Sequence, residues 1–101
     1  MIIYSVTINI NQSIEAEWLE WMLKVHIPEV MQTGCFLNYY INRLIEPESQ
    51  EGTSTYNIQY ECLSLEMINK YQQSFAKQLQ AKHTEKFNNQ FVAFRTLLER
   101  L

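Results

Sequence analysis

The chain has 101 residues, of which 47% are hydrophobic and 19% are charged, and its formal net charge is -3. This length and composition predict one globular domain, residues 1–101, and exclude a disordered or fibrous chain. The chain has eight basic and eleven acidic residues, and the basic ones form no cluster in the sequence. We therefore expect neither nucleic acid nor an anionic membrane surface as a partner.

The sequence has no pattern typical of secretion or of a membrane span. Its first residues pass directly into alternating strand-like sequence, without a basic start and an apolar core, and no apolar run reaches membrane-spanning length. The two cysteines, Cys35 and Cys62, are far apart and show no C-x-x-C spacing. Reduced thiols fit this spacing better than a disulfide framework. We expect a soluble, cytoplasmic protein.

The first third of the chain predicts a strand and then a helix. In residues 1–10, MIIYSVTINI, side chains alternate with the period of two that is typical of a strand with one buried face. Ser13 stands where it would cap a helix whose first turn is acidic. The apolar arc of this helix is wider than one sheet face needs, which indicates a second contact surface, either a partner subunit or a pocket wall. Pro28 disfavours helical geometry at the preceding residue, which predicts a kink and puts His26 at a helix end.

The rest of the chain predicts a hairpin, a second helix and a last strand. Residues 35–46 and 55–62 are rich in Tyr, Phe and Ile, and the polar loop between them favours antiparallel pairing. Ser64 would cap the second helix, whose apolar stripe recurs at steps of three and four residues. Continuation of that stripe brings lysines onto it, so we expect the helix to end or bend near Ala81. A separate surface turn then leads into the final strand, 90–99.

This order of elements predicts an α+β fold. With right-handed crossovers it gives a ferredoxin-like βαββαβ sandwich, in which a four-stranded antiparallel sheet carries two helices on one face. The other face, called here the open face, is expected to have a polar centre that comprises Thr7, Asn9, Asn57, Gln59, Glu61 and Arg95. Its apolar margin is expected to comprise Phe36, Tyr40, Phe91 and Leu97.

Two interpretations of this open face remain. It is either a solvated sheet surface with a few exposed apolar side chains, or the wet interior formed when two such sheets pair face to face. We prefer the second interpretation, because the broad apolar arc of the first helix and the apolar margin both need covering. It predicts a homodimer of the dimeric α/β-barrel type.

Four motifs carry a resemblance to an uncharacterised bacterial family that is known only as a domain of unknown function. They are WLEWM, HIPEV followed by TG, LQAKHTEKF and FVAFRTLLE. More distantly, the arrangement is similar to the dimeric α/β-barrel superfamily, whose members include small-molecule monooxygenases, isomerases, lyases and haem-degrading proteins. The resemblance implies the fold and the dimer but no catalytic assignment, because fold alone does not define function. No cofactor is predicted.

His26 is the candidate catalytic residue. A histidine on the apolar side of a helix end, beside Trp and Met, can serve as a general acid or base whose pKa its surroundings set. The alternative is structural: the ring donates a hydrogen bond to a carbonyl that Pro28 leaves free. His83, which lies between lysines in KHTEKF, is expected at a solvated turn, with a second acid–base group or ligand as the alternative.

Five further residues are candidates for ligand binding. Arg95 and Glu61 on the open face would recognise a small carboxylate, since a guanidinium matches a carboxylate in two-point geometry, or they would pair with each other. Asn9 would be a neutral polar neighbour of that site. Trp18 and Trp21 would stack on a flat ligand, with core or dimer packing as the alternative.

No metal site is predicted. The two histidines and the two cysteines have the right ligand types, but they lack the close paired spacing of zinc sites. Two hypotheses about function follow. In the first, the protein binds a small carboxylate or aromatic compound and acts as an enzyme or a binding protein. In the second, it is a non-enzymatic dimerisation or regulatory module. A cavity that contains His26 with a free ring nitrogen favours the first, and a closed, well-packed interface favours the second.

Overall fold

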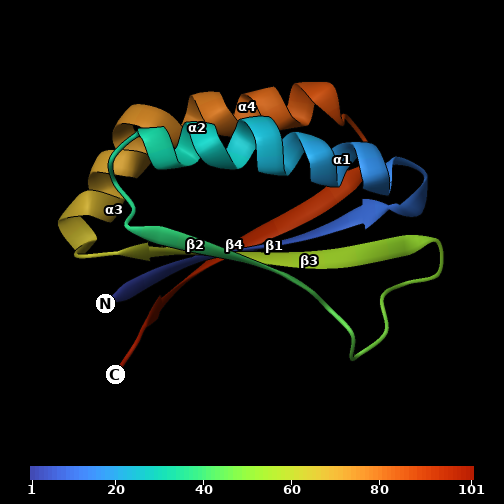
Figure 1. Cartoon of the computed structure of the whole chain (residues 1–101), viewed down its shortest axis with the longest axis horizontal. Coiled ribbons are helices and arrows are strands. Elements are labelled where there is room, and N and C mark those ends of the chain that lie inside the picture. Colours follow the sequence, from blue (N-terminus) through green and yellow to red (C-terminus); the bar gives the residue numbers. More distant parts are fainter.

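The computed structural model describes every residue from 1 to 101 and contains one four-stranded sheet. The strands are β1 (Ile2–Asn11), β2 (Asn38–Arg43), β3 (Thr53–Cys62) and β4 (Phe91–Glu99). They pair antiparallel in the order β2-β3-β1-β4 (Figure 1). This topology confirms the predicted ferredoxin-like α+β sandwich.

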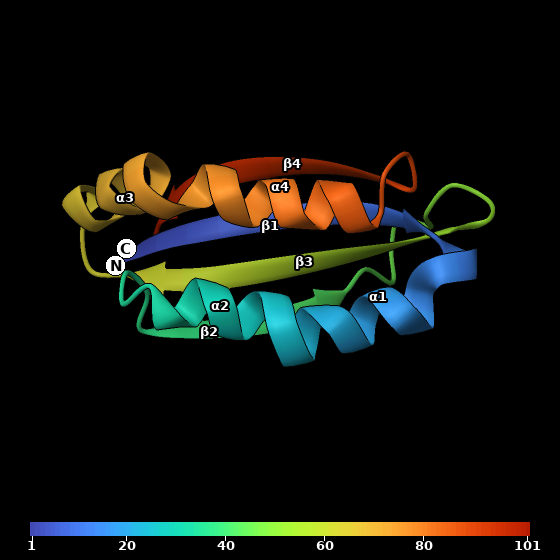
Figure 2. The same cartoon turned by 90° about the horizontal axis from the view of Figure 1, so that it is seen from above.

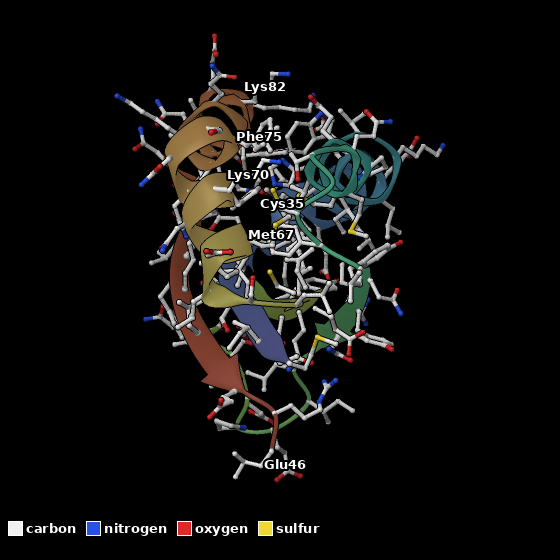
Figure 3. All side chains as sticks on the ribbon, turned by 90° about the vertical axis from the view of Figure 1, so that its left-hand side faces the viewer. Cys35, Glu46, Met67, Lys70, Phe75 and Lys82 are labelled. Carbon is white, nitrogen blue, oxygen red and sulfur yellow. The ribbon has the colours of Figure 1, made fainter.

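Two helical runs lie side by side over one face of this sheet (Figures 1 and 2). The first consists of η1 (Gln12–Ile14), α1 (Glu15–Trp21), η2 (Met22–His26) and α2 (Ile27–Gln32). The second consists of α3 (Leu65–Tyr71), η3 (Gln72–Ala76) and α4 (Lys77–Lys86). Figure 3 shows the same layers end-on, with both helical runs on one side of the sheet. None of these helices is long and apolar enough to cross a membrane.

The first helical run continues through Pro28 instead of ending there. The predicted extended geometry before Pro28 is wrong, because Ile27 stays in the right-handed helical region, with φ -61° and ψ -44°. Proline has no N–H and its ring clashes with the carbonyl four residues earlier in a regular helix. The chain accommodates it with a π-helical turn, in which the N–H of Ile27 donates to the carbonyl of Met22. His26 therefore lies within the run and not at its end. The predicted Ser13 cap is also wrong, since Ser13 lies in the 3₁₀ turn η1 and makes no capping bond.

The second helical run also contains a π-helical turn, and this turn explains why the predicted helix end near Ala81 is wrong. The helix continues to Lys86. Its buried stripe takes a five-residue step from Tyr71 to Ala76, across η3, and then resumes regular spacing through Leu79 to His83. A regular period of 3.6 residues would instead place Lys82 on that stripe. His83 is consequently buried, with 6% of its surface exposed, and does not lie in a solvated turn.

The register of the sheet decides which side chains face the helices. The predicted polar centre of the open face is confirmed for Thr7, Asn9, Asn57, Gln59 and Glu61, which alternate with the buried core residues of β1 and β3. Arg95 was expected there and is not, because it pairs with Val6 and so faces the helices. Phe91, opposite Ile10, and Leu97, opposite Tyr4, were expected on the margin of the open face, but they too lie on the helix face.

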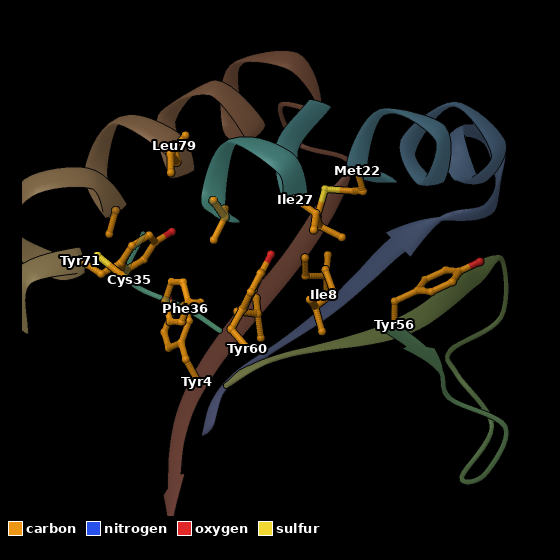
Figure 4. Packing of buried hydrophobic residues seen from close by; sticks show 14 of the residues in the cluster. Tyr4, Ile8, Met22, Ile27, Cys35, Phe36, Tyr56, Tyr60, Tyr71 and Leu79 are labelled. Carbon is orange, nitrogen blue, oxygen red and sulfur yellow. The ribbon is translucent and has the colours of Figure 1, made fainter. Parts of the chain in front are cut away.

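A single hydrophobic core fills the space between the helices and the sheet (Figure 4). One end of it is an aromatic cluster in which Tyr4 stacks on Phe36, with ring centroids 5.9 Å apart, and Tyr71 lies edge-on to Phe36 at 4.9 Å. Phe36 was expected on the margin of the open face, but it is 6% exposed and belongs to this core. Tyr40 does lie on the open face, opposite Gln59 on the edge strand.

Candidate functional site

A small cavity lies between the two helical runs and the sheet. Its volume is about 30 Å³, which is room for one or two water molecules. Ten of its 14 lining residues are hydrophobic, and the other four are His26, Gln80, His83 and Arg95. The cavity therefore brings together polar groups from η2, α4 and β4 within an otherwise apolar wall.

Two histidines face each other across this cavity. The ring centroids of His26 and His83 are 5.8 Å apart, and the rings are inclined at 63°. The π-helical turns bring them together, since His26 lies in η2 and the register after η3 turns His83 inward. Trp21 stacks on His26 at 5.3 Å, and Phe91 meets His83 edge-on at 4.3 Å.

The only hydrogen bond between the side chains of this histidine pair and the rest of the protein comes from Trp18. Its indole Nε1 donates to Nε2 of His83 at 2.8 Å. The other nitrogen of His83 and both nitrogens of His26 have no partner in the protein. Since no buried side-chain nitrogen or oxygen is without a partner, these three atoms keep some exposure. They are free to bond with water or with a ligand.

Both histidines are neutral at pH 7. Burial lowers the pKa of His26 to about 4, the charges of Arg95 and Lys82 lower it further, and Glu29 opposes them. The pKa of His83 is likewise lowered to about 4, chiefly by burial and then by His26 and Arg95. A neutral imidazole has one donor and one acceptor nitrogen. The cavity thus holds two imidazoles that can exchange hydrogen bonds with a bound molecule.

Arg95 is the one arginine of the protein without an ion pair. Arg43 lies 3.8 Å from Glu15, and Arg100 pairs with Glu61. Arg95 lines the cavity, is exposed to solvent, and has no carboxylate within 4.0 Å. Its guanidinium is therefore available to an anionic group at the solvent side of the cavity.

Buried tyrosines complete the polar lining. Tyr60 and Tyr71 are only 2% and 3% exposed, and burial is the main cause that raises the pKa of each hydroxyl above its usual range. Both hydroxyls stay protonated, and neither bonds to a protein group. Figure 4 shows the hydroxyl of Tyr60 directed from the sheet towards the helices. The tyrosines thus offer O–H donors to the cavity.

The other predicted ligand-binding residues do not join this site. Glu61 lies on the open face and pairs with Arg100, so the predicted site between Glu61 and Arg95 is not formed. The amide of Asn9 donates to the hydroxyls of Thr53 and Thr55 on the open face. Trp18 is completely buried in the core, and Trp21 is half-buried behind His26.

Sequence reasoning preferred a solvated turn for His83 over a functional role, and it missed Tyr60 and Tyr71 as members of the site. The sequence signal for His83 is its four-residue spacing from Leu79. This spacing belongs to the buried stripe only if the stripe takes one five-residue step before Leu79. The two cysteines take no part in the cavity. Cys35 and Cys62 are buried free thiols, and no three side chains of the metal-binding types gather in one place.

This fold and cavity define a ferredoxin-like α+β protein with a polar cavity between its helices and its sheet. The whole chain, residues 1–101, matches the family model described as "Domain of unknown function (DUF4286)", and the protein belongs to that family. A search of the curated proteins found no match.

Solved structures share this fold at low sequence identity. HapK from Hahella chejuensis has a TM-score of 0.72 and 10% identity, with 100% of this chain and 93% of that chain covered. A putative antibiotic biosynthesis monooxygenase from Deinococcus radiodurans has a TM-score of 0.68 and 19% identity, with 100% and 93% covered. A dimeric ferredoxin-like protein from an uncultured marine organism has a TM-score of 0.67 and 14% identity, with 100% and 95% covered. These similarities show the fold alone.

Proposed function

We propose that this protein binds a small carboxylate or aromatic compound in the cavity between the helices and the sheet. His26 serves there as a hydrogen-bonding or acid–base group, and Arg95 binds the anionic part of the ligand. The observation that supports this proposal is the pairing of a histidine ring free of protein hydrogen bonds with the one unpaired arginine, both on the same cavity. A closed helix-to-sheet interface would have favoured a non-enzymatic association module instead.

The cavity chemistry suits a molecule with an aromatic part and an oxygen-bearing part. Met22 and the aromatic side chains offer apolar and π surfaces, and Arg95 offers two parallel N–H donors to a carboxylate. His26 is neutral at pH 7, so it can accept a hydrogen bond or a proton from an acidic group of the ligand. The same geometry serves a binding protein or an enzyme that transfers a proton.

The ligand must enlarge the cavity as it enters. Pockets for small organic molecules usually measure about 300–1000 Å³, whereas this cavity measures about 30 Å³. Arg95 and Gln80 line it with long side chains that no hydrogen bond or ion pair holds in place. We propose that the cavity opens by movement of these two side chains.

The proposal includes a homodimer formed through the open face. Four large apolar or aromatic side chains are exposed there: Tyr40, Val92, Phe94 and Leu98, with Val92 70% and Phe94 61% exposed. Patches of this kind mark association surfaces. A solved structure with the same fold is described as a dimeric ferredoxin-like protein. The second candidate function, an association module alone, would use this same face and leave the cavity without a ligand.

A thermal-shift experiment tests the cavity proposal. Benzoate, salicylate and further small aromatic carboxylates are added to the wild type, to His26→Ala, to Arg95→Gln and to Arg100→Gln. We expect one or more compounds to raise the wild-type midpoint, because a ligand of the folded state stabilises it. Arg95→Gln and His26→Ala should lose the shift, while Arg100→Gln keeps it because Arg100 lies outside the cavity.

The control variants make the outcome decisive. Val25→Ala, one residue from His26 but outside the cavity, shows whether a small truncation in this turn is enough to abolish the shift. A shift that Arg95→Gln and Arg100→Gln lose equally would contradict the assigned site. No shift with any compound, with all variants folded, would leave the association module as the function.

A further inference from the structure

The hydrogen bond between Trp18 and His83 decides where the proton of His83 lies. An indole N–H is a donor and never an acceptor, so the nitrogen that it contacts must carry a lone pair. That nitrogen is Nε2 of His83, at 2.8 Å. A neutral imidazole has one proton on its two ring nitrogens, and this proton must then be on Nδ1.

Nδ1 of His83 is the ring nitrogen that the protein leaves without a partner. His83 is 6% exposed and lines the cavity, but Nδ1 has no partner in the protein. Because no fully buried polar side-chain atom is without a partner, Nδ1 is not sealed in the core. The acceptor nitrogen of the ring is thus taken by Trp18, and the N–H on Nδ1 is the group that the ring has left for a ligand.

We infer that Trp18 is a positioning residue that holds His83 as a permanent hydrogen-bond donor, and that this donor binds an oxygen atom of the ligand. His83 cannot act as the base of this site. Protonation at Nε2 would set two N–H groups against each other in the core and break the bond to Trp18. His26, whose ring nitrogens are both without protein partners, is the acceptor of the pair. The two histidines therefore have different roles.

The other polar groups of the cavity agree with this assignment. Arg95 has only N–H donors, the hydroxyls of Tyr60 and Tyr71 are protonated, and no carboxylate lines the cavity. A ligand that offers acceptor oxygens, as a ketone, a carboxylate or a phenolate does, complements such a surface. A cationic amine has no lone pair to accept from these donors, and the cavity offers it no carboxylate. This choice of ligand class depends on the proposed binding function, whereas the state of His83 does not.

Nitrogen-detected NMR tests the state of His83 without any ligand. Protein labelled with ¹⁵N is examined at pH 7 for the tautomer of each histidine and for a coupling through the hydrogen bond between Trp18 Nε1 and His83 Nε2. We expect His83 to be the Nδ1–H tautomer and the coupling to be present. A His83 that is protonated at Nε2, or charged at pH 7, would overturn the inference.

Two variants separate positioning from packing. Trp18→Phe removes the N–H but keeps an aromatic ring, so it should release His83 into a mixture of tautomers. His83→Gln keeps an acceptor for Trp18 and a donor for the cavity, whereas His83→Ala keeps neither. If Trp18→Phe does not fold, the two His83 variants still test whether His83 donates to the ligand, since their readout is binding and not stability.

The ligand arm uses three probes of similar size: benzoate, acetophenone and benzylamine. We expect benzoate and acetophenone to move the Nδ1–H resonance of His83, and benzylamine to leave it unchanged. His83→Ala should weaken benzoate binding about tenfold, as the loss of one buried hydrogen bond predicts, and His83→Gln should restore most of it. Equal affinity in His83→Ala and the wild type would overturn the donor role while leaving the proposed function standing. If Nδ1–H is observed but no probe binds, the proposed function fails and the ligand class fails with it.

Discussion

Trp18 and His83 are joined by a buried hydrogen bond of 2.8 Å that connects the two helical runs across 65 residues of sequence. Trp18 is completely buried and His83 is 6% exposed. A buried polar group without a partner costs about 1–3 kcal/mol. Each side chain therefore offsets the cost of burying the other, and the bond connects α1 to α4.

This relationship predicts a difference between the two tryptophans. Trp18→Phe leaves Nε2 of His83 without a donor and creates a small void, so it should destabilise the fold by about 2–4 kcal/mol. Trp21→Phe removes an N–H that has no protein partner on a half-buried ring and should cost clearly less. Urea unfolding of the wild type and both variants measures this difference. Equal losses would show that the hydrogen bond contributes nothing beyond ring volume.

The two neutral histidines predict that stability falls in mild acid. Their pKa values are about 4 in the folded protein, below the value of about 6.5 expected in the unfolded chain. Between these values the unfolded chain binds more protons, so stability rises with pH there. It should be fully present above about pH 6.5 and decline as the pH falls towards 4. Urea midpoints at pH 7, 6, 5 and 4.5 measure the slope.

A double variant isolates the histidine contribution to that slope. His26→Gln with His83→Gln removes both titrating rings, so its stability should change little between pH 6.5 and 4.5. The lowered pKa of Glu15, caused chiefly by the hydroxyl of Tyr56, acts below the ordinary carboxyl value of 4.5 and so outside this window. An unchanged slope in the double variant would assign the acid sensitivity to other groups.

The proposed homodimer predicts sensitivity to charge on the open face. Phe94→Asp places a carboxylate in the exposed apolar patch of β4 and should shift the protein from dimer to monomer. Ile45→Asp is the matched control, because Ile45 is 83% exposed but lies in the loop after β2. Light scattering coupled to size exclusion measures the mass of each. A monomeric wild type, or a dimeric Phe94→Asp variant, would contradict this mode of association.

The π-helical turn in the second run predicts opposite effects of a deletion and an insertion. Deleting exposed Ser74 shortens the step from Tyr71 to Ala76 to the four residues of a regular helix, which leaves the buried stripe in place. Inserting one alanine after Ser74 lengthens this step to six residues, which neither a regular turn nor one π-helical turn accommodates, and turns everything after it by about 100°. Residues from Leu79 to Phe87 then lose their burial, at about 1.5–3 kcal/mol for each large apolar side chain. Thermal melts should show a folded Ser74 deletion and a largely unfolded insertion variant.

Several elements were predictable because their signals are local. The strand at β1 follows from its alternation, and the hydroxyl of Ser64 accepts from the N–H of Met67, as a capping residue does. Gly34, at φ +76°, ends the first helical run with the left-handed geometry that glycine adopts readily. The order of these elements was enough to predict the ferredoxin-like topology.

The candidate site depended on features that have no local signal. In β4 both faces carry apolar residues, so alternation did not reveal that Arg95 turns towards the helices, and only pairing with Val6 decides it. A π-helical turn adds one residue to a stripe, and nothing in the neighbouring sequence marks where it falls. The sequence by itself determined the elements, their order and the fold. Only tertiary packing decided the phase of β4 and of both helices. A shift of one residue reverses the two faces of a strand and turns a helix by about 100°, so it changes which side chains are buried. The phase that packing selected brought His26, His83 and Arg95 to one cavity.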